Sequence, residues 1–190
     1  AYELQRSLVG SEMCIRDRKG TAADIPAVAG IYDALLTREE QGLLTTGWTR
    51  GVYPTEQTAR AALEAGTLYV MEDGGRVVAA AKIDQNQMEQ YAQCRWHSDA
   101  APEQVLVLHT LVVDPEAKGR GYGSAFVAFY EKMARETGRP WLRMDTNARN
   151  TPARALYAKL GYAEVSVVEG VFNGIPGVRL VCLEKGLEAR

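Results

Sequence analysis

Alternating glycines between an apolar segment and an amphipathic one constrain the fold of this chain more than any other feature. Residues 105–113 are apolar and rich in β-branched side chains, which predicts a buried strand. Apolar residues recur at helical spacing after the glycines, and Gly138 with Pro140 marks the end of that helix. The chain therefore passes from a strand through a tight turn directly into a helix.

The turn has the sequence Lys118-Gly119-Arg120-Gly121-Tyr122-Gly123-Ser124. Glycines at alternate positions let the backbone approach a ligand closely, and the free N–H groups that begin a helix attract an anion. The spacing matches neither the dinucleotide fingerprint G-x-G-x-x-G nor the P-loop, and glycines alone would be explained as a simple corner. With the strand and helix around them, they predict a site for a phosphate group.

A second motif follows one helix and one strand later, in which Asn150, Ala153 and Tyr157 precede Lys159-Leu160-Gly161-Tyr162. Together the motifs resemble the GNAT superfamily of acetyl-CoA-dependent N-acetyltransferases, whose signature is Arg/Gln-x-x-Gly-x-Gly/Ala followed by Asn-x-x-Ala-x-x-x-Tyr. The resemblance covers roughly residues 19–185. Lys118 stands where arginine or glutamine is more usual, which affects one side-chain contact at most because most of the grip on a pyrophosphate comes from backbone N–H groups.

The resemblance implies an α/β (α+β) fold in one domain. It consists of a mixed, mainly antiparallel twisted sheet with helices on both faces, and a splay between the fourth and fifth strands admits the pantetheine arm of acetyl-CoA. A length of 190 residues also favours a single domain.

Local patterns place the remaining elements along the chain. We expect helices near 25–36 and 55–64, and a third at 151–160 that begins at Thr151 as N-cap. Strands are expected at 67–72 and 76–83, which form a hairpin, and at 140–146. The last two strands, at 163–169 and 178–184, are expected around a loop at 173–177. Residues 85–103 are polar apart from Tyr91 and Trp96 and form an excursion before the long apolar strand.

The first 18 residues do not resemble the rest of the domain. The bases ATG TGT ATA AGA GAC would translate to residues 13–17, and that base string resembles the transposon end used to prepare sequencing libraries. We therefore predict that residues 1–18 are a non-native, adapter-derived or disordered segment, and that the domain occupies residues 19–190. Resequencing the locus tests this, because a continuous native reading frame through residues 8–17 would refute an adapter origin.

Charge and composition limit the classes of molecule that this chain is expected to bind. The net charge is −2 with no dense lysine and arginine cluster, and no apolar run has the roughly 20 residues of a spanning helix, so we expect no nucleic acid or membrane partner and a cytoplasmic location. Three widely spaced cysteines, Cys14, Cys94 and Cys182, favour reduced thiols. Cys94 and His97 form an isolated C-x-x-H, which lacks the further ligands of a zinc site, so no metal is expected.

The expected reaction needs a base, because a primary amine with a pKa near 10.4 is almost wholly protonated at pH 7. His109 lies on the strand that relatives use for this role, and an imidazole suits it, although a histidine in an apolar strand is often only a hydrogen-bonded core residue. Asp145 and Glu89 are the other candidates.

The resemblance assigns the remaining roles. Tyr157 corresponds to the acid that protonates the leaving thiolate, although it also lies on an apolar helix stripe, and the main chain of residues 111–113 would stabilise the oxyanion and pair with pantetheine. Arg154 or Lys159 would reach a phosphate. The residues expected to bind acetyl-CoA are Leu111, Val112, Val113, Lys118, Gly119, Arg120, Gly121, Tyr122, Gly123, Ser124, Asn150, Ala153 and Tyr157.

The predicted function is transfer of an acetyl group from acetyl-CoA to a primary amine by direct attack in a ternary complex. The alternatives are a catalytically silent acyl-CoA-binding module and, less well supported, a nucleotide-phosphate enzyme. The acceptor is a small molecule, an amino acid or a peptide N-terminus. Residues 43–54 and 84–103 should line its pocket, with Trp48, Tyr53, Tyr91 and Trp96 as apolar walls and Asp84 or Glu89 to attract a cation. Relatives often dimerise, but no stripe here specifies a homodimer.

Overall fold

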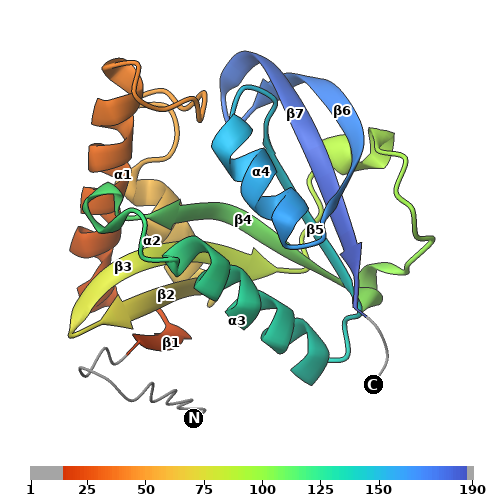
Figure 1. Ribbon diagram of the computed structural model, residues 1–190, viewed down its shortest axis with the longest axis horizontal. Coiled ribbons are helices and arrows are strands. Elements are labelled where there is room, and N and C mark those ends of the chain that lie inside the picture. Colours follow the sequence, from red (N-terminus) through yellow and green to blue (C-terminus); the bar gives the residue numbers. More distant parts are fainter. Residues whose placement is uncertain (1–14, 188–190) are drawn as a thin grey trace.

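One seven-stranded sheet organises the chain, and the computed structural model describes it over residues 15–187 (Figure 1). Its strand order is β1-β2-β3-β4-β5-β7-β6, and all neighbours are antiparallel except β4 and β5, which are parallel. The strands are β1 Ile15–Lys19, β2 Leu68–Asp73, β3 Arg76–Asp84, β4 Val105–Val113, β5 Trp141–Asn147, β6 Ala163–Phe172 and β7 Ile175–Gly186. The expected mixed, mainly antiparallel sheet is confirmed.

Helices cover both faces of this sheet (Figure 1). Helices α1 (Ile25–Glu40) and α2 (Glu56–Glu64) pack on one face, where the buried stripe of α1 meets Leu68 and Val112. Helices α3 (Tyr122–Glu136) and α4 (Thr151–Lys159) pack on the other. Residues 15–187 also contain four short 3-10 helices: η1 Ala22–Asp24, η2 Glu89–Gln93, η3 Pro102–Gln104 and η4 Pro115–Ala117. Among residues 15–187, no helix has the length and apolarity needed to cross a membrane.

The parallel pair β4–β5 opens partway along its length. Val105–Leu108 pair with Trp141–Met144, and the ladder stops there. Beyond this point β4 pairs only with β3, and β5 continues to Asn147 paired only with β7. The two strands begin side by side and diverge (Figure 1). The predicted splay between the fourth and fifth strands is therefore confirmed.

Residues 85–104 cover the face of β5–β7 that lies opposite α4. Tyr91 is buried there, and Trp96 packs against the same apolar cluster. This differs from the prediction that both aromatic rings line an acceptor pocket. Large rings in a polar segment are buried here because α1 and α2 cover only the β2–β4 part of this face.

The first strand begins before the predicted domain boundary at residue 19. Residues 15–18 pair with β2, and Arg18 forms ion pairs of 2.7 Å with Asp24 and 2.8 Å with Glu72. The buried Oδ1 of Asp17 has no hydrogen-bond partner among the described residues, and burial raises the pKa of this carboxyl to about 6. An unpartnered buried carboxyl fits its position poorly. The origin of residues 1–18 stays a prediction, and residues 1–14 lie outside the described part of the chain.

Two expected boundaries are wrong. Strands β6 and β7 continue to a two-residue turn, Asn173-Gly174, where a loop of residues 173–177 was expected. Both turn residues have positive φ, at 50° and 79°, as the tight hairpin turn requires. The N-cap of α4 is Asn150 and not Thr151, because the Asn150 side chain accepts a hydrogen bond from the N–H of Ala153.

Candidate active site

The glycine turn presents a row of free main-chain donors. Gly119 and Gly121 have φ of 84° and 76°, and Gly121 is the N-cap of α3. Within residues 15–187, the N–H groups of residues 119–124 donate no hydrogen bond to another residue. A Cβ added at Gly119 or Gly121 would meet nothing within 4 Å. The turn therefore leaves open space in front of unpaired N–H groups at the positive end of a helix, which suits a phosphate.

The start of α3 lies close to α4 and to the splay. A Cβ on Gly123 would lie 3.3 Å from Cδ2 of Leu156 and 3.9 Å from Cγ2 of Val113. Lys118 and Arg120 are exposed, whereas the Tyr122 side chain is buried and donates a hydrogen bond to Asp73. Only the main-chain groups of Tyr122 are therefore available to bind a ligand.

A bulge in β4 sets the geometry at the mouth of the splay. Ala80 pairs with Val112 and Lys82 pairs with His109, so β4 has an extra residue in this stretch. Thr110 lies in the bulge with φ of 52°, and its hydroxyl shares a hydrogen bond with the Tyr53 hydroxyl. Residues 111–113 then continue along the β4 edge that no longer faces a partner strand.

His109 occupies the first β4 position beyond the parallel ladder. Its Nε2 lies 2.9 Å from Oδ1 of Asp84, and its side chain is only 12% exposed. Burial acts to raise the pKa of Asp84, but the hydrogen bond and charge of His109, with a contribution from Lys82, lower it overall. His109 is thus hydrogen-bonded, as a core histidine would be, at the point where β4 and β5 begin to diverge.

Asp145 is the corresponding first residue of β5 beyond the ladder. The Tyr91 hydroxyl donates a 2.6 Å hydrogen bond to its Oδ2. Burial raises the pKa of Asp145, while the bond from Tyr91 and the charge of His109 lower it less. Because Leu108 and Met144 both face α3, their neighbours His109 and Asp145 face the opposite side of the sheet. Glu89, the third base candidate, is exposed on η2.

Tyr157 approaches the splay from the side of α3 and α4. Its ring is buried in the apolar cluster and meets Tyr162 edge to face, with centroids 6.1 Å apart. Burial raises the pKa of the Tyr157 hydroxyl, and the carboxylate of Asp145 raises it further. This tyrosine is therefore protonated at neutral pH, and it lies across the sheet from the histidine.

Other predicted ligand residues have structural partners. The Oδ1 of Asn150 accepts the N–H of Ala153 at 3.4 Å, which leaves its amide nitrogen available. Arg154 pairs with Glu164 at 2.7 Å and donates to the carbonyl of Ala148 at 2.9 Å, so its guanidinium is already satisfied. Lys159 is exposed in the last turn of α4.

Residues 43–54 cross the open end of the splay. Tyr53 reaches Thr110 of β4, while Gly47 lies so close to Asn147 of β5 that a Cβ would come within 2.2 Å of its Nδ2. Val52 touches the β6–β7 turn, because a Cβ on Gly174 would lie 3.2 Å from its Cγ1. This segment therefore joins both diverging strands.

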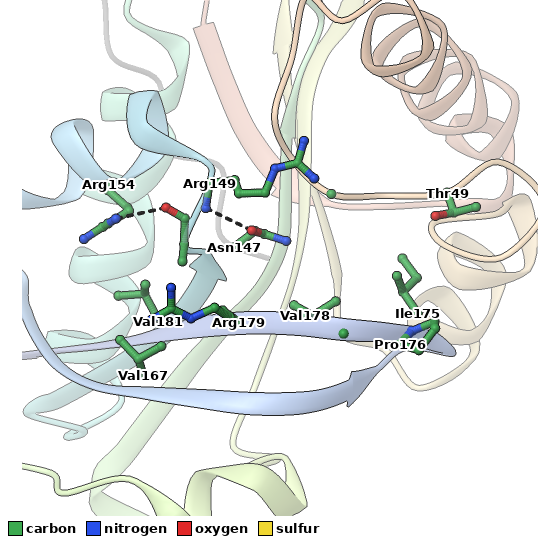
Figure 2. Close-up of a pocket in the computed structure, with 13 residues that line it drawn as sticks. Thr49, Asn147, Arg149, Arg154, Val167, Ile175, Pro176, Val178, Arg179 and Val181 are labelled. Atoms are coloured by element: carbon green, nitrogen blue, oxygen red, sulfur yellow. Dashed lines mark hydrogen bonds between the residues drawn. The ribbon is translucent and has the colours of Figure 1, made fainter.

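A cavity of about 520 Å³ lies beneath this crossing, between the end of β5 and the β6–β7 hairpin (Figure 2). Gly47 and Thr49 of the segment 43–54 line it, but neither His109 nor Tyr157 nor the glycine turn is among its lining residues, and no residue of 84–103 is. The hairpin residues that replace them were missed, although the Asn173-Gly174 turn signal was present in the sequence. Three arginines, Arg149, Arg154 and Arg179, line the cavity, and none of its lining residues is acidic. Within residues 15–187, no group of three or more acidic, histidine or cysteine side chains is placed to hold a metal ion.

Comparisons with known proteins agree with this geometry. A family model described as the acetyltransferase (GNAT) family matches residues 32–162. An uncharacterized N-acetyltransferase of Methanocaldococcus jannaschii is 32% identical over 77 residues, which are 40% of this chain and 34% of that relative. The match thus spans about a third of the relative's length.

Solved structures share the fold. An acetyltransferase of the GNAT family from Streptococcus agalactiae 2603 superposes with a TM-score of 0.77 at 20% identity, over 93% of this chain and 97% of that one. The yncA protein of Salmonella typhimurium, solved with its cofactor acetyl-CoA, has a TM-score of 0.65 at 18% identity, over 93% and 95% of the two chains. At these identities the likeness shows the fold alone.

Proposed function

We propose that this chain, which belongs to the acetyltransferase (GNAT) family, transfers the acetyl group of acetyl-CoA to a primary amine by direct attack in a ternary complex. One observation carries the proposal. A row of unpaired N–H groups leads into a splay that has a largely buried, hydrogen-bonded histidine on one face and a protonated tyrosine on the other. The glycine turn would hold the diphosphate, and the open edge of residues 111–113 would pair with the pantetheine arm.

Acetyl-CoA supplies an acetyl group activated as a thioester. His109 would remove a proton from the incoming ammonium group, so that the nitrogen lone pair is free to attack the carbonyl carbon. With Nε2–H donated to Asp84, the free lone pair of His109 lies on Nδ1. Asp84 therefore fixes the tautomer and also stabilises the protonated imidazole.

Two further groups complete the transfer. Main-chain N–H groups on the open edge of β4 would stabilise the negative charge that develops on the carbonyl oxygen. When the carbon–sulfur bond breaks, Tyr157 would give its proton to the sulfur, and the second proton that the nitrogen loses as the amide forms would restore the Tyr157 hydroxyl through water. The raised pKa of Tyr157 keeps its hydroxyl protonated at neutral pH, so the proton is present when the thiolate leaves.

The lining of the cavity supports an acceptor with an anionic group besides its amine. Arg154 pairs with Glu164 and Arg179 pairs with Glu169, so within residues 15–187 Arg149 is the one lining arginine without an ion pair. Arg149 is exposed at the rim (Figure 2). This arrangement favours amino acids and short peptides over polyamines.

The test measures binding and turnover separately. Calorimetry with coenzyme A should give a saturable heat, and thiol release from acetyl-CoA should rise with amino acids or peptides but not with polyamines. Binding without thiol release for any amine would instead support the silent acyl-CoA-binding module. The absence of any binding heat would remove both functions.

Gly121→Ala tests the phosphate cradle. Because a Cβ at this position meets nothing in the free protein, its methyl group would occupy the space in front of the N–H row. We expect affinity for coenzyme A to fall roughly tenfold, together with a backbone strain cost of about 1 kcal/mol. Gly74→Ala is the matched control, since Gly74 also has positive φ (58°) and open space but lies in the β2–β3 turn. An equal loss of affinity in both variants would assign the effect to strain.

Tyr157→Phe tests the proposed acid. We expect kcat to fall roughly 10- to 100-fold, with the dissociation constant for acetyl-CoA unchanged within about twofold, because the ring still packs against Tyr162. Steady-state kinetics across pH and calorimetry measure the two quantities. Unchanged turnover at every pH would leave Tyr157 as a packing residue only.

A further inference from the structure

Cys94 and Cys182 lie 88 positions apart in the chain, yet their Sγ atoms are 2.9 Å apart. Both are free thiols in the structure. A disulfide requires about 2.05 Å between the sulfurs, so a small movement of one side chain would suffice. From this contact we propose that the pair is a redox modification site, which forms a reversible disulfide on exposure to a small-molecule disulfide of the glutathione type.

The backbone around both thiols is fixed by other bonds. Cys182 lies inside β7, where it pairs with Asp145 of β5 and Ser166 of β6. On the Cys94 side, the Arg95 N–H donates to Oγ of Ser166 at 2.8 Å, and the Trp96 indole donates to the carbonyl of Tyr91 at 3.0 Å. The segment that carries Cys94 lies against β6 and β7 (Figure 1). The two sulfurs therefore meet because their neighbours are anchored.

The two thiols have unequal environments. Cys94 is partly exposed, whereas Cys182 is fully buried. The hydrogen bond shared with Cys182 lowers the pKa of the Cys94 thiol, and the same bond together with burial raises the pKa of Cys182. Cys94 is therefore the attacking thiol, and Cys182 resolves the intermediate from inside the fold.

The chemistry balances without any other reactant. The Cys94 thiolate, having lost its proton to water, attacks one sulfur of the small disulfide, and the first small thiolate leaves and takes a proton. Cys182 then attacks the Cys94 sulfur, its proton passes to the second departing thiolate, and the protein disulfide forms. The protein loses two electrons, and the small disulfide becomes two thiols.

The new bond would fasten residues 85–104 to the sheet beside the candidate site. Tyr91, which donates to Asp145, lies three residues before Cys94, and Asp145 is the cross-strand partner of Cys182. The loop closed by the bond is long, so oxidation should raise the melting temperature, by roughly 5 °C or more. The proposal concerns thiol chemistry and does not depend on the acetyl-transfer function.

The experiment uses the full chain with Cys14→Ser, because Cys14 lies outside the described residues and is a third thiol. The native protein is equilibrated with oxidised glutathione, denatured with N-ethylmaleimide present, and weighed by mass spectrometry. We expect a mass loss of about 2 Da, no maleimide adducts, and full reversal by dithiothreitol.

Two further variants on this background separate the roles of the thiols. With Cys182→Ser, the reaction should stop at one bound glutathione, because the resolving thiol is missing. With Cys94→Ser, the buried Cys182 should remain reduced and take one maleimide after denaturation. Two maleimide adducts on the oxidant-treated parent, or glutathione addition to the Cys94→Ser variant as fast as to the Cys182→Ser variant, would overturn the proposal.

Discussion

Replacing His109 by glutamine is expected to lower kcat for acetyl transfer by roughly 10²- to 10⁴-fold, which is the usual contribution of a positioned general base. Glutamine keeps a donor for Asp84 but has no lone pair that takes a proton at neutral pH. The acetyl-CoA dissociation constant should change less than about twofold, because no ligand contact is removed. Thiol-release kinetics and calorimetry measure the two effects.

Substitutions at two residues close to His109 test whether His109 or Asp145 is the general base. Asp84→Asn should cost roughly tenfold in kcat, because the imidazole that takes up the proton loses its carboxylate partner. Asp145→Asn keeps an oxygen that accepts the bond from Tyr91 and should cost less than His109→Gln. If Asp145→Asn is inactive while His109→Gln still turns over, the base is Asp145.

Elements with a strong local signal could be predicted from the sequence. The apolar run at residues 105–113 has the same bounds as β4, and Gly74-Gly75 forms the β2–β3 turn. These signals are local because side-chain periodicity and positive φ depend on neighbouring residues alone. The splay could not be derived from spacing and came from the family resemblance.

Features that depend on distant contacts were missed. The arginine-lined cavity joins Thr49, the end of β5 and the β6–β7 hairpin, and nothing local links these segments. Pro176 and Gly177 indicated a loop, but they lie where β7 extends past β5 and pairs with β6 alone, and a strand tolerates both residues where one of its edges is unpaired. The partner of His109 was also hidden, because Asp84 lies 25 positions away on β3.

The position of the segment 85–104 also depends on contacts between residues far apart in the sequence, because a buried ion pair holds this segment to the sheet. Nε of Arg143 lies 2.8 Å from Oε2 of Glu184, with 5% and 1% of the two side chains exposed. Glu184 also accepts the N–H groups of His97 and Ser98, at 2.9 and 3.0 Å. The guanidinium of Arg143 stacks on Trp96, 4.2 Å from the ring centroid. One pair of charges therefore fixes several residues of an otherwise polar segment.

Arg143→Met is expected to lower the free energy of unfolding by about 3–5 kcal/mol, because it leaves the Glu184 carboxylate buried without a counter-charge. Urea denaturation with linear extrapolation measures this loss. Arg60→Met is the matched control: Arg60 pairs with Glu56 at 2.6 Å, but both side chains are about half exposed, so the cost should stay below about 1 kcal/mol. Arg143→Met with Glu184→Gln should lose less than Arg143→Met alone, since the isolated charge is gone. Equal losses for Arg143→Met and Arg60→Met would show that the buried pair does not anchor residues 85–104.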